Sequence, residues 1–203
     1  MSLRLTVRSA AAAVAATSAL TLATGTASAV KLVLRGPGVL PAGTAVTARS
    51  FGITAGAETC ALTELQGVII SNSKPTDTIK LLSGTLTGCL AGTEVITSTY
   101  SGLPYTLKLS HLGTFKEKGT PRVRWIDTFA APPGVCKYET VSAVPAGSFT
   151  VPTHPTPPAP VILEVSNWLI TPFSSSPSCG PGSLTANFEL LVPSVGPVES
   201  EDS

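Results

Sequence analysis

Apolar and polar residues alternate along two segments of the chain, residues 105–111 and 184–190. Successive side chains of a β-strand point to opposite faces, so this alternation predicts strands with one face in a core and the other in water. Such strands are typical of antiparallel sheets. The residues predicted to share the apolar faces are Tyr105, Leu107, Leu109 and His111 in the first segment and Leu184, Ala186, Phe188 and Leu190 in the second.

The rest of the chain predicts further strands. After residue 30, no stretch of three turns carries apolar residues at helical spacing without an intervening Gly or Pro. The 18 glycines and 18 prolines fall at intervals that suit short strands. About ten strands predict an all-β fold, a single antiparallel β-sandwich with a barrel as the alternative. The weaker strand candidates are residues 30–35, 44–51, 67–71, 78–82, 94–100, 121–129, 136–141 and 161–170.

Residues 151–160 interrupt this pattern with five prolines in ten positions. Proline fixes φ and removes a backbone donor, so this segment favours polyproline II and is excluded from a central strand. We interpret it as a rigid loop between strands. A linker between two half-domains and a recognition segment for another protein are the alternatives.

The first 29 residues are typical of a secretory signal peptide. Arg4 and Arg8 precede a mildly apolar stretch over residues 9–23, and Ala-Ser-Ala at 27–29 offers a cleavage site between small residues. No second apolar run is long enough for a transmembrane helix. We therefore expect a secreted, extracellular protein without a transmembrane segment after signal cleavage.

Cleavage after residue 29 leaves a β-domain over residues 30–198 and an acidic tail over 199–203, which we expect to be flexible. Without Arg4 and Arg8 the chain has 11 basic and 12 acidic residues, which favours neither nucleic acid nor an anionic membrane as partner. Charged residues make up 12% of the chain, against about 25% in an average soluble domain. Ser, Thr and backbone groups must therefore supply much of the polar surface.

The four cysteines, Cys60, Cys89, Cys136 and Cys179, are read as disulfides because an extracellular setting is oxidising. Three pairings are possible, and we favour the sequential one, Cys60–Cys89 and Cys136–Cys179. Each bridge would then contribute about 3.5–4 kcal/mol to stability in the chain-entropy model. The closest cysteines are 29 positions apart and the chain has only two histidines, so we expect no metal site.

Short motifs surround these cysteines. They are Cys60-x-Leu62, Leu65-Gln66-Gly67-Val68, Ser71-Asn72, Cys89, Leu103-Pro104-Tyr105-Thr106-Leu107, Cys136-Lys137-Tyr138, Gly147-Ser148-Phe149, Cys179 and Ser183-Leu184-Thr185-Ala186-Asn187-Phe188. Over residues 60–191 the pattern resembles a group of uncharacterised small secreted actinobacterial β-sandwich proteins with four cysteines. The resemblance implies the sequential disulfides and the sandwich. It implies no catalytic residue and no ligand.

Motifs for catalysis are missing from the sequence. There is no G-x-S-x-G elbow, and Ser110 and His111 are neighbours on a predicted strand, so they point to opposite faces. Asp127 is the most site-like carboxylate, because Trp125 and Phe129 share its strand face. An acid beside aromatic rings can have a raised pKa or can bind sugar hydroxyls. The alternative is a strand-end carboxylate that caps a turn, and His111 is interpreted as a strand-end or core histidine.

A local basic patch is the other candidate site. It combines Lys116, Lys118, Arg122 and Arg124 with Trp125, around a predicted turn at residues 119–121. Such a patch could bind an acidic polysaccharide or a phosphorylated wall polymer. A solvated hairpin tip, or a sheet edge protected by Lys, is the alternative.

We therefore expect a secreted, non-enzymatic β-sandwich protein, a cell-envelope-associated or extracellular binding module without a cofactor. Its partner is unknown from the sequence, and a cell-wall polymer or another extracellular protein are the candidates. A secreted protease inhibitor with residues 151–160 as its reactive segment is the alternative. A hydrolase assembled from Asp127 and His111 ranks lowest, because the chain has so few histidines.

Overall fold

The structure, a computed structural model, describes residues 32–72, 75–117, 122–130, 132–141, 146–151, 157–173 and 179–202. Every regular element in these ranges is a β-strand, which confirms the all-β prediction. Within the same ranges no helix is long and apolar enough to cross a membrane. The predicted signal peptide, residues 1–29, lies outside the described residues.

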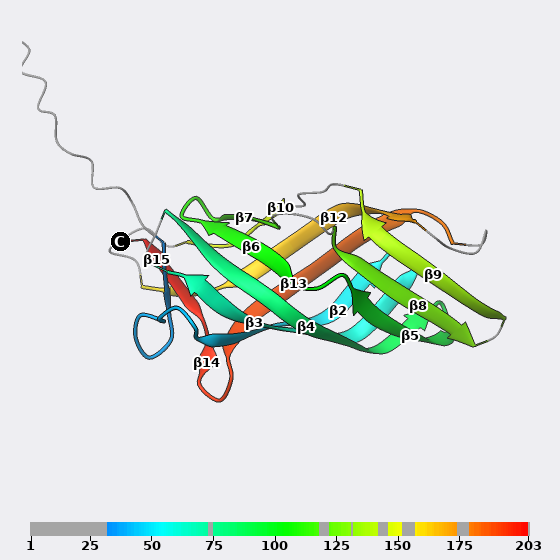
Figure 1. Ribbon diagram of the computed structural model, residues 1–203, viewed down its shortest axis with the longest axis horizontal. Helices are drawn as coiled ribbons and strands as arrows, with labels where there is room; N and C mark the ends of the chain where they lie inside the picture. The colour runs from blue at the N-terminus through cyan, green and yellow to red at the C-terminus, as the bar shows by residue number, and fades with distance from the viewer. Residues whose placement is uncertain are drawn as a thin grey trace, which may run out of the picture.

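The strands are labelled in chain order (Figure 1). Both segments with clear alternation form strands, and their apolar residues from Tyr105 to Leu109 and from Leu184 to Leu190 are buried as predicted. β3 and β4 are much longer than the sequence indicated, because they continue through Thr-, Ser- and Gly-containing stretches without strict alternation. The bounds are β1 (Leu32–Arg35), β2 (Ala45–Ala55), β3 (Glu58–Ser71), β4 (Thr76–Ala91), β5 (Glu94–Ser101), β6 (Tyr105–Ser110), β7 (Thr114–Glu117), β8 (Arg124–Ala130), β9 (Pro133–Thr140), β10 (Ala146–Ser148), β11 (Ala159–Pro160), β12 (Ile162–Pro172), β13 (Gly182–Val192), β14 (Gly196–Pro197) and β15 (Glu199–Asp202).

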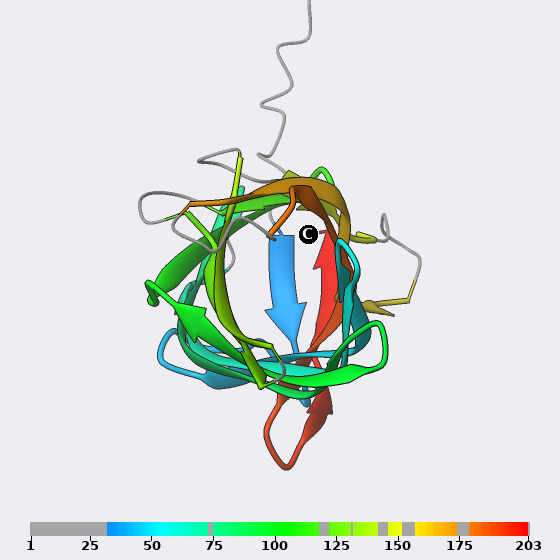
Figure 2. The same ribbon diagram turned by 90° about the vertical axis from the view of Figure 1, so that its right-hand side faces the viewer.

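The main sheet closes on itself. β2, β3, β4, β5, β8, β9, β12 and β13 pair in that order, each with its neighbour, and β13 pairs again with β2. Toward the other end of the molecule, β6, β7 and β10 take the place of β5, β8 and β9 between β4 and β12. Figure 2 shows the resulting ring from one end. Opposite walls pack on a shared core, so the layers of a sandwich are joined along their sides as in a barrel.

A small sheet covers one end of this ring. β1, β15 and β11 form it, and it lies at the end where the chain terminates (Figures 1 and 2). The side-chain amide of Asn72 holds β1 in place, because it accepts from the backbone N–H of Leu34 at 2.9 Å and donates to the carbonyl oxygens of Leu34 and Leu40 at 2.8 and 2.7 Å. We call this region the capped end.

The acidic C-terminal segment belongs to this cap. The sequence predicted a flexible tail over residues 199–203, whereas residues 199–202 form β15 and pair with β1. Two side-chain contacts explain the difference: Glu201 forms an ion pair with Arg35, and the hydroxyl of Ser200 donates to the carbonyl oxygen of Thr150 at 2.8 Å. The acidic residues therefore complete a sheet, and Ser200 is fully buried.

Both predicted disulfides are present. Cys60–Cys89 joins β3 to β4, and Cys136–Cys179 joins β9 to the residues just before β13. All four cysteines lie toward the end of the ring opposite the cap, near the turns that follow β2, β4 and β8. We call this region the open end.

Candidate functional site

A cavity of about 420 Å³ lies at the open end, between the β2–β3 turn, the β8–β9 turn and residues 180–181. Its walls are mostly apolar, with Ala55, Phe129 and Ile170 among them. Glu58 and Tyr138 are the ionisable side chains that line it. Ligand pockets commonly have volumes of about 300–1,000 Å³ and occur in the mouths of closed β-sheets. We call this space the mouth cavity.

Glu58 reaches the interior because the alternation of β2 and β3 slips by one residue. Ser50 and Thr63 face the core, and on the far side of the slip Ile53 and Cys60 do so instead. The slip is centred on Gly52, whose φ of 78° is in the left-handed region that glycine adopts without strain. Glu58 has the same parity as Cys60 and is therefore turned inward, with 7% of its surface exposed.

Asp127 comes from β8, on the opposite wall. Trp125, Asp127 and Phe129 do share the inner face of this strand, as the sequence indicated. The indole Nε1–H of Trp125 donates to Oδ2 of Asp127 at 3.0 Å. Asp127 lies in the middle of the strand and is 1% exposed, so it does not cap a turn. Its second oxygen, Oδ1, is buried and has no hydrogen-bond partner of ordinary geometry among the described residues.

The carboxyl group of Glu58 keeps its proton at neutral pH. Burial raises the pKa of Glu58 to about 9, and a hydrogen bond with Asp127 and the negative charge of Asp127 add to the rise. Hydrogen bonds from Tyr138 and Trp125 lower the pKa of Glu58 by a smaller amount. Glu58 is therefore protonated at neutral pH and can donate to the Asp127 carboxylate. Burial, followed by the charges of Glu58 and Asp127, also raises the pKa of Tyr138, which keeps its phenol as a donor.

A second, much smaller cavity of about 20 Å³ lies behind Glu58. Glu58 lines both cavities, whereas Asp127 lines only the inner one. Ser98, which pairs directly with Asp127 across β5 and β8, also lines the inner cavity. Ser98 is 5% exposed, and its hydroxyl has no hydrogen-bond partner among the described residues. Two buried polar groups therefore face a space about as large as one water molecule.

Aromatic rings pack together on the wall of the open end that β8 and β9 form. Trp125 and Tyr138 are cross-strand neighbours, and their rings stack with centroids 5.4 Å apart and planes inclined by 26°. The disulfide at Cys136 lies beside them on the wall of the mouth cavity. The side chains that fix Glu58 and Asp127 are thus held by stacking and by a covalent link.

The predicted basic patch has a different arrangement. Arg122 and Arg124 both bind Glu139, at 3.0 and 2.8 Å, and the guanidinium of Arg124 lies 4.7 Å from the ring centroid of Phe173. Glu139 offsets part of their charge. Trp125 is on the opposite, inner face of β8, so the structure does not bring its ring to this surface.

Of the two lysines of the basic patch, the structure describes Lys116 but not Lys118. Lys116 is exposed on β7, where it pairs across the sheet with Lys108 on β6. Lys118 lies outside the described residues. Binding of an acidic polymer by this surface stays a prediction.

The proposed pair of Asp127 and His111 is not brought together. His111 directly follows β6, in the turn before β7 at the capped end, and its backbone N–H donates to the carbonyl oxygen of Pro75 at 3.3 Å (Figure 1). Asp127 lies inside the open end. Half of the Pro-rich segment, residues 152–156, is outside the described residues, so the inhibitor alternative stays a prediction.

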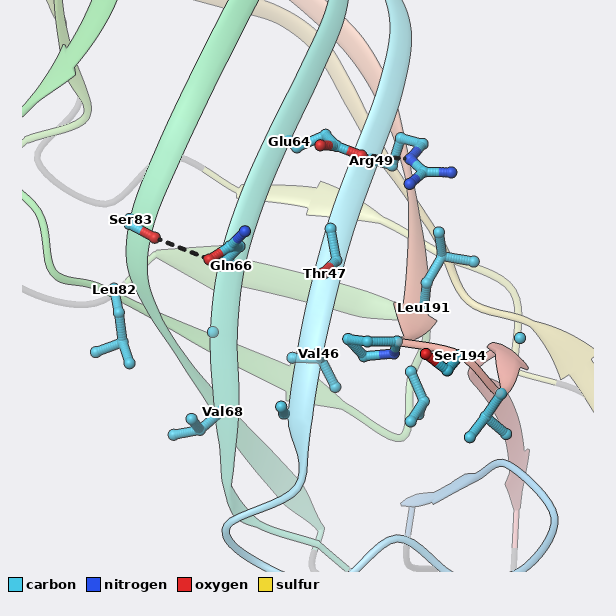
Figure 3. A pocket seen from close by; sticks show the side chains of 16 residues that line it. Val46, Thr47, Arg49, Glu64, Gln66, Val68, Leu82, Ser83, Leu191 and Ser194 are labelled. Atoms are coloured by element: carbon cyan, nitrogen blue, oxygen red, sulfur yellow. Dashed lines mark hydrogen bonds and ion pairs between the residues drawn. The ribbon is translucent and has the colours of Figure 1, made fainter.

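A groove of about 940 Å³ lies on the outer surface. It follows the outer faces of β2, β3 and β4 beside the β13–β14 hairpin (Figure 3). Its polar side chains bind one another: Nε of Arg49 donates to Glu64 at 2.7 Å, and Ser83 donates to Gln66 at 3.4 Å. Because these groups already have partners, the groove gives less reason to expect a ligand than the mouth cavity does.

Sequence reasoning missed Glu58 as a site residue. Counting the alternation of β3 backward from Leu65 would place Glu58 on the outer face. The available signal was Cys60: disulfide sulfurs are usually buried, and Glu58 has the same parity as Cys60. Tyr138 had the same type of signal, since it shares the parity of Cys136 on β9.

Comparisons with known proteins add no name to this arrangement. No family model matches the chain, and neither curated proteins nor solved structures give a match. The resemblance to secreted actinobacterial proteins therefore stays a prediction. In the described part of the chain, no three His, Cys, Asp or Glu side chains are grouped in a way that could hold a metal ion.

Proposed function

We propose that this protein is an extracellular, non-enzymatic binding protein that takes a small ligand into the mouth cavity of its closed sheet. One observation carries the proposal: a space of ligand size is lined by apolar side chains and by one buried carboxyl group, Glu58, backed by Asp127. This combination of apolar walls and a few fixed polar groups is characteristic of ligand pockets.

An extracellular setting is supported by two separate features. The protein has two disulfides, one between β3 and β4 and one between β9 and the residues just before β13, and disulfides persist in oxidising compartments. The first 29 residues have the pattern of a signal peptide. Both features agree with release from the cell.

Binding is favoured over catalysis by the arrangement of the carboxyl groups. Glycosidases that use two carboxyl groups hold them about 5 Å or more apart, so that a sugar or a water fits between them. Glu58 and Asp127 instead share a hydrogen bond. Asp127 does not line the mouth cavity, so only one member of the pair faces a ligand there.

The test is nuclear magnetic resonance of the oxidised protein with a set of small aromatic compounds. The two tryptophan indole N–H signals report on two places, since Trp125 lies beside the mouth cavity and Trp168 lines neither cavity of the open end. We expect binding to shift the Trp125 signal and to leave the Trp168 signal in place. Phe129→Ala, in the cavity wall, should weaken binding, and Phe51→Ala, exposed on the outer face, should not. Shifts that are equal at both tryptophans would contradict the proposal.

A further inference from the structure

The mouth cavity and the inner cavity are lined by acidic side chains without a cation to match them. Neither is lined by a Lys, Arg or His among the described residues. The titratable groups that face Glu58 are Asp127 on β8 and Tyr138 on β9, and Tyr100 on β5 lines the inner cavity beside it. All three are acids or phenols. Buried charges in proteins are normally paired, so this site is electrostatically incomplete.

Unused hydrogen-bond acceptors point in the same direction. Oδ1 of Asp127 and the hydroxyl of Ser98 are buried without partners, and both residues line the space behind Glu58. A buried polar group without a partner is costly, so the acid pair is short of hydrogen-bond donors on the side away from the mouth cavity. An ammonium group has three donors, a positive charge and no acceptor, which matches an acid pair better than a hydroxyl does.

The other residues that line the mouth cavity indicate the chemistry of the rest of the ligand. Ala55, Phe129, Ile170 and Pro181 contribute apolar surface around the mouth cavity, and among the described residues that line it Glu58 is the only acidic or basic side chain apart from the phenol of Tyr138. A second charge on the ligand would have no partner there. The volume of about 420 Å³ corresponds to a small molecule rather than to a polymer chain.

We propose that the ligand is a protonated primary amine on a small apolar body, and that Glu58 is its counter-ion, with Asp127 behind it. This inference rests on the proposed function, because it specifies the ligand of the same cavity. Trp125 and Tyr138 fix the positions of the two carboxyl groups by hydrogen bonds.

Binding of the amine releases one proton. In the free protein the proton lies on Glu58; when the ammonium arrives, the O–H bond of Glu58 breaks, the proton leaves to solvent, and the carboxylate pairs with the ammonium. Alkyl amines similar to the Lys side chain keep their proton up to a pH of about 10. Binding should therefore strengthen as pH rises toward 9, the pKa of Glu58 in the free protein.

The experiment compares three probes of one shape on the oxidised full-length protein: 2-phenylethylamine, 2-phenylethanol and 3-phenylpropanoate. The Trp125 indole signal is followed in each titration, with Trp168 as the internal reference. We expect the amine to bind at least about tenfold more tightly than the alcohol, because a charge-assisted pair replaces a neutral hydrogen bond. The anionic probe should bind most weakly. Between pH 6 and 8 the affinity for the amine should rise toward tenfold per pH unit, while the affinity for the alcohol stays constant.

Matched variants identify the counter-ion. Glu58→Gln keeps the shape of the side chain and should abolish the preference for the amine over the alcohol. Glu64→Gln is the control, because Glu64 is on the same strand but faces outward and binds Arg49. It should retain the full preference and its pH dependence. The probe series on the unmodified protein needs no variant, so the proposal remains testable if Glu58→Gln fails to fold.

The outcomes separate this inference from the proposed function. Equal affinities for amine and alcohol, tighter binding of the anion, or a flat pH dependence would overturn the amine assignment, while a shift at Trp125 alone would still support a binding site. If none of the three probes moves the Trp125 signal at millimolar concentration, both proposals fail.

Discussion

The two ends of the closed sheet differ in the kind of polar group that they leave buried without a hydrogen-bond partner among the described residues: a nitrogen of an ion-paired Arg35 at the capped end, and oxygens of Asp127 and Ser98 at the open end. At the capped end, Asn72 satisfies three backbone groups and Ser200 donates to Thr150, although Nε of Arg35 is buried there without a hydrogen-bond partner in the described part of the chain. At the open end, Asp127 and Ser98 keep buried atoms without partners. Unpaired buried groups cost stability, and they persist where another requirement holds them in place. The contrast agrees with the proposal that the open end, rather than the cap, binds a ligand.

The means of stabilisation differ as well. The cap buries apolar side chains completely, including Leu34, Val161 and Val198. The open end contains a cavity beside its buried apolar side chains, such as Ile53 and Ile170, and has both disulfides near it. A disulfide stabilises by restricting the unfolded chain, so it does not require the local core to be full. The two disulfides thus stabilise the open end although it contains the mouth cavity.

The largest expected effect is on the core under the cap. Leu34→Ala should lower the free energy of unfolding by about 3 kcal/mol, because it removes a fully buried side chain and leaves a cavity. Phe129→Ala, a larger truncation at the open end, should cost less, since Phe129 already borders a cavity. Urea unfolding of the oxidised protein measures both, with the exposed Leu112→Ala as reference. A greater loss for Phe129→Ala would reverse the proposed division between the two ends.

The next expected effect is a change in the free energy of unfolding that differs in sign between the two ends. Asn72→Ala removes the amide that bonds to Leu34 and Leu40, and the free energy of unfolding should fall by about 2 kcal/mol. Ser98→Ala removes a hydroxyl that has no partner, so the protein should keep its stability or gain a little. The same unfolding assay compares them. Destabilisation by Ser98→Ala equal to that of Asn72→Ala would show that the Ser98 hydroxyl has a structural role.

Much of this fold could be predicted from the sequence because its signals are local. Period-two alternation located the strands at residues 105–110 and 184–190, and cysteine count with spacing led to the sequential disulfides. Closure of the sheet could not be predicted. It depends on which strands meet across the ring, such as β12 with β13 and β13 with β2, and pairings of this kind leave no mark in the pattern of either strand.

Only one half of the candidate site could be predicted from the sequence, because only that half has a local pattern. Asp127 with Trp125 and Phe129 is a local pattern on one strand, and it was recognised as site-like. Its partner Glu58 comes from β3, on another wall, and faces inward only because the alternation slips at Gly52. The acidic tail shows a similar limit, since Glu201 becomes ordered through Arg35, far away in the sequence.

The smallest expected effect, taken per pH unit, is a change of stability with pH that originates at the open end. The pKa of Glu58 is about 9 in the folded protein and close to 4.5 when exposed, so the folded state holds an extra proton between these values. The contribution of Glu58 is therefore fully present below about pH 4.5 and is lost as pH rises toward 9. The loss is at most about 1.4 kcal/mol per pH unit for one proton. Glu58→Gln, which cannot titrate, should give a flatter curve of unfolding free energy against pH, whereas Glu64→Gln should follow the unmodified protein. If the Glu58→Gln curve is as steep as that of the unmodified protein, the proton is not held at Glu58 and the open end lacks the acid pair on which its proposed role depends.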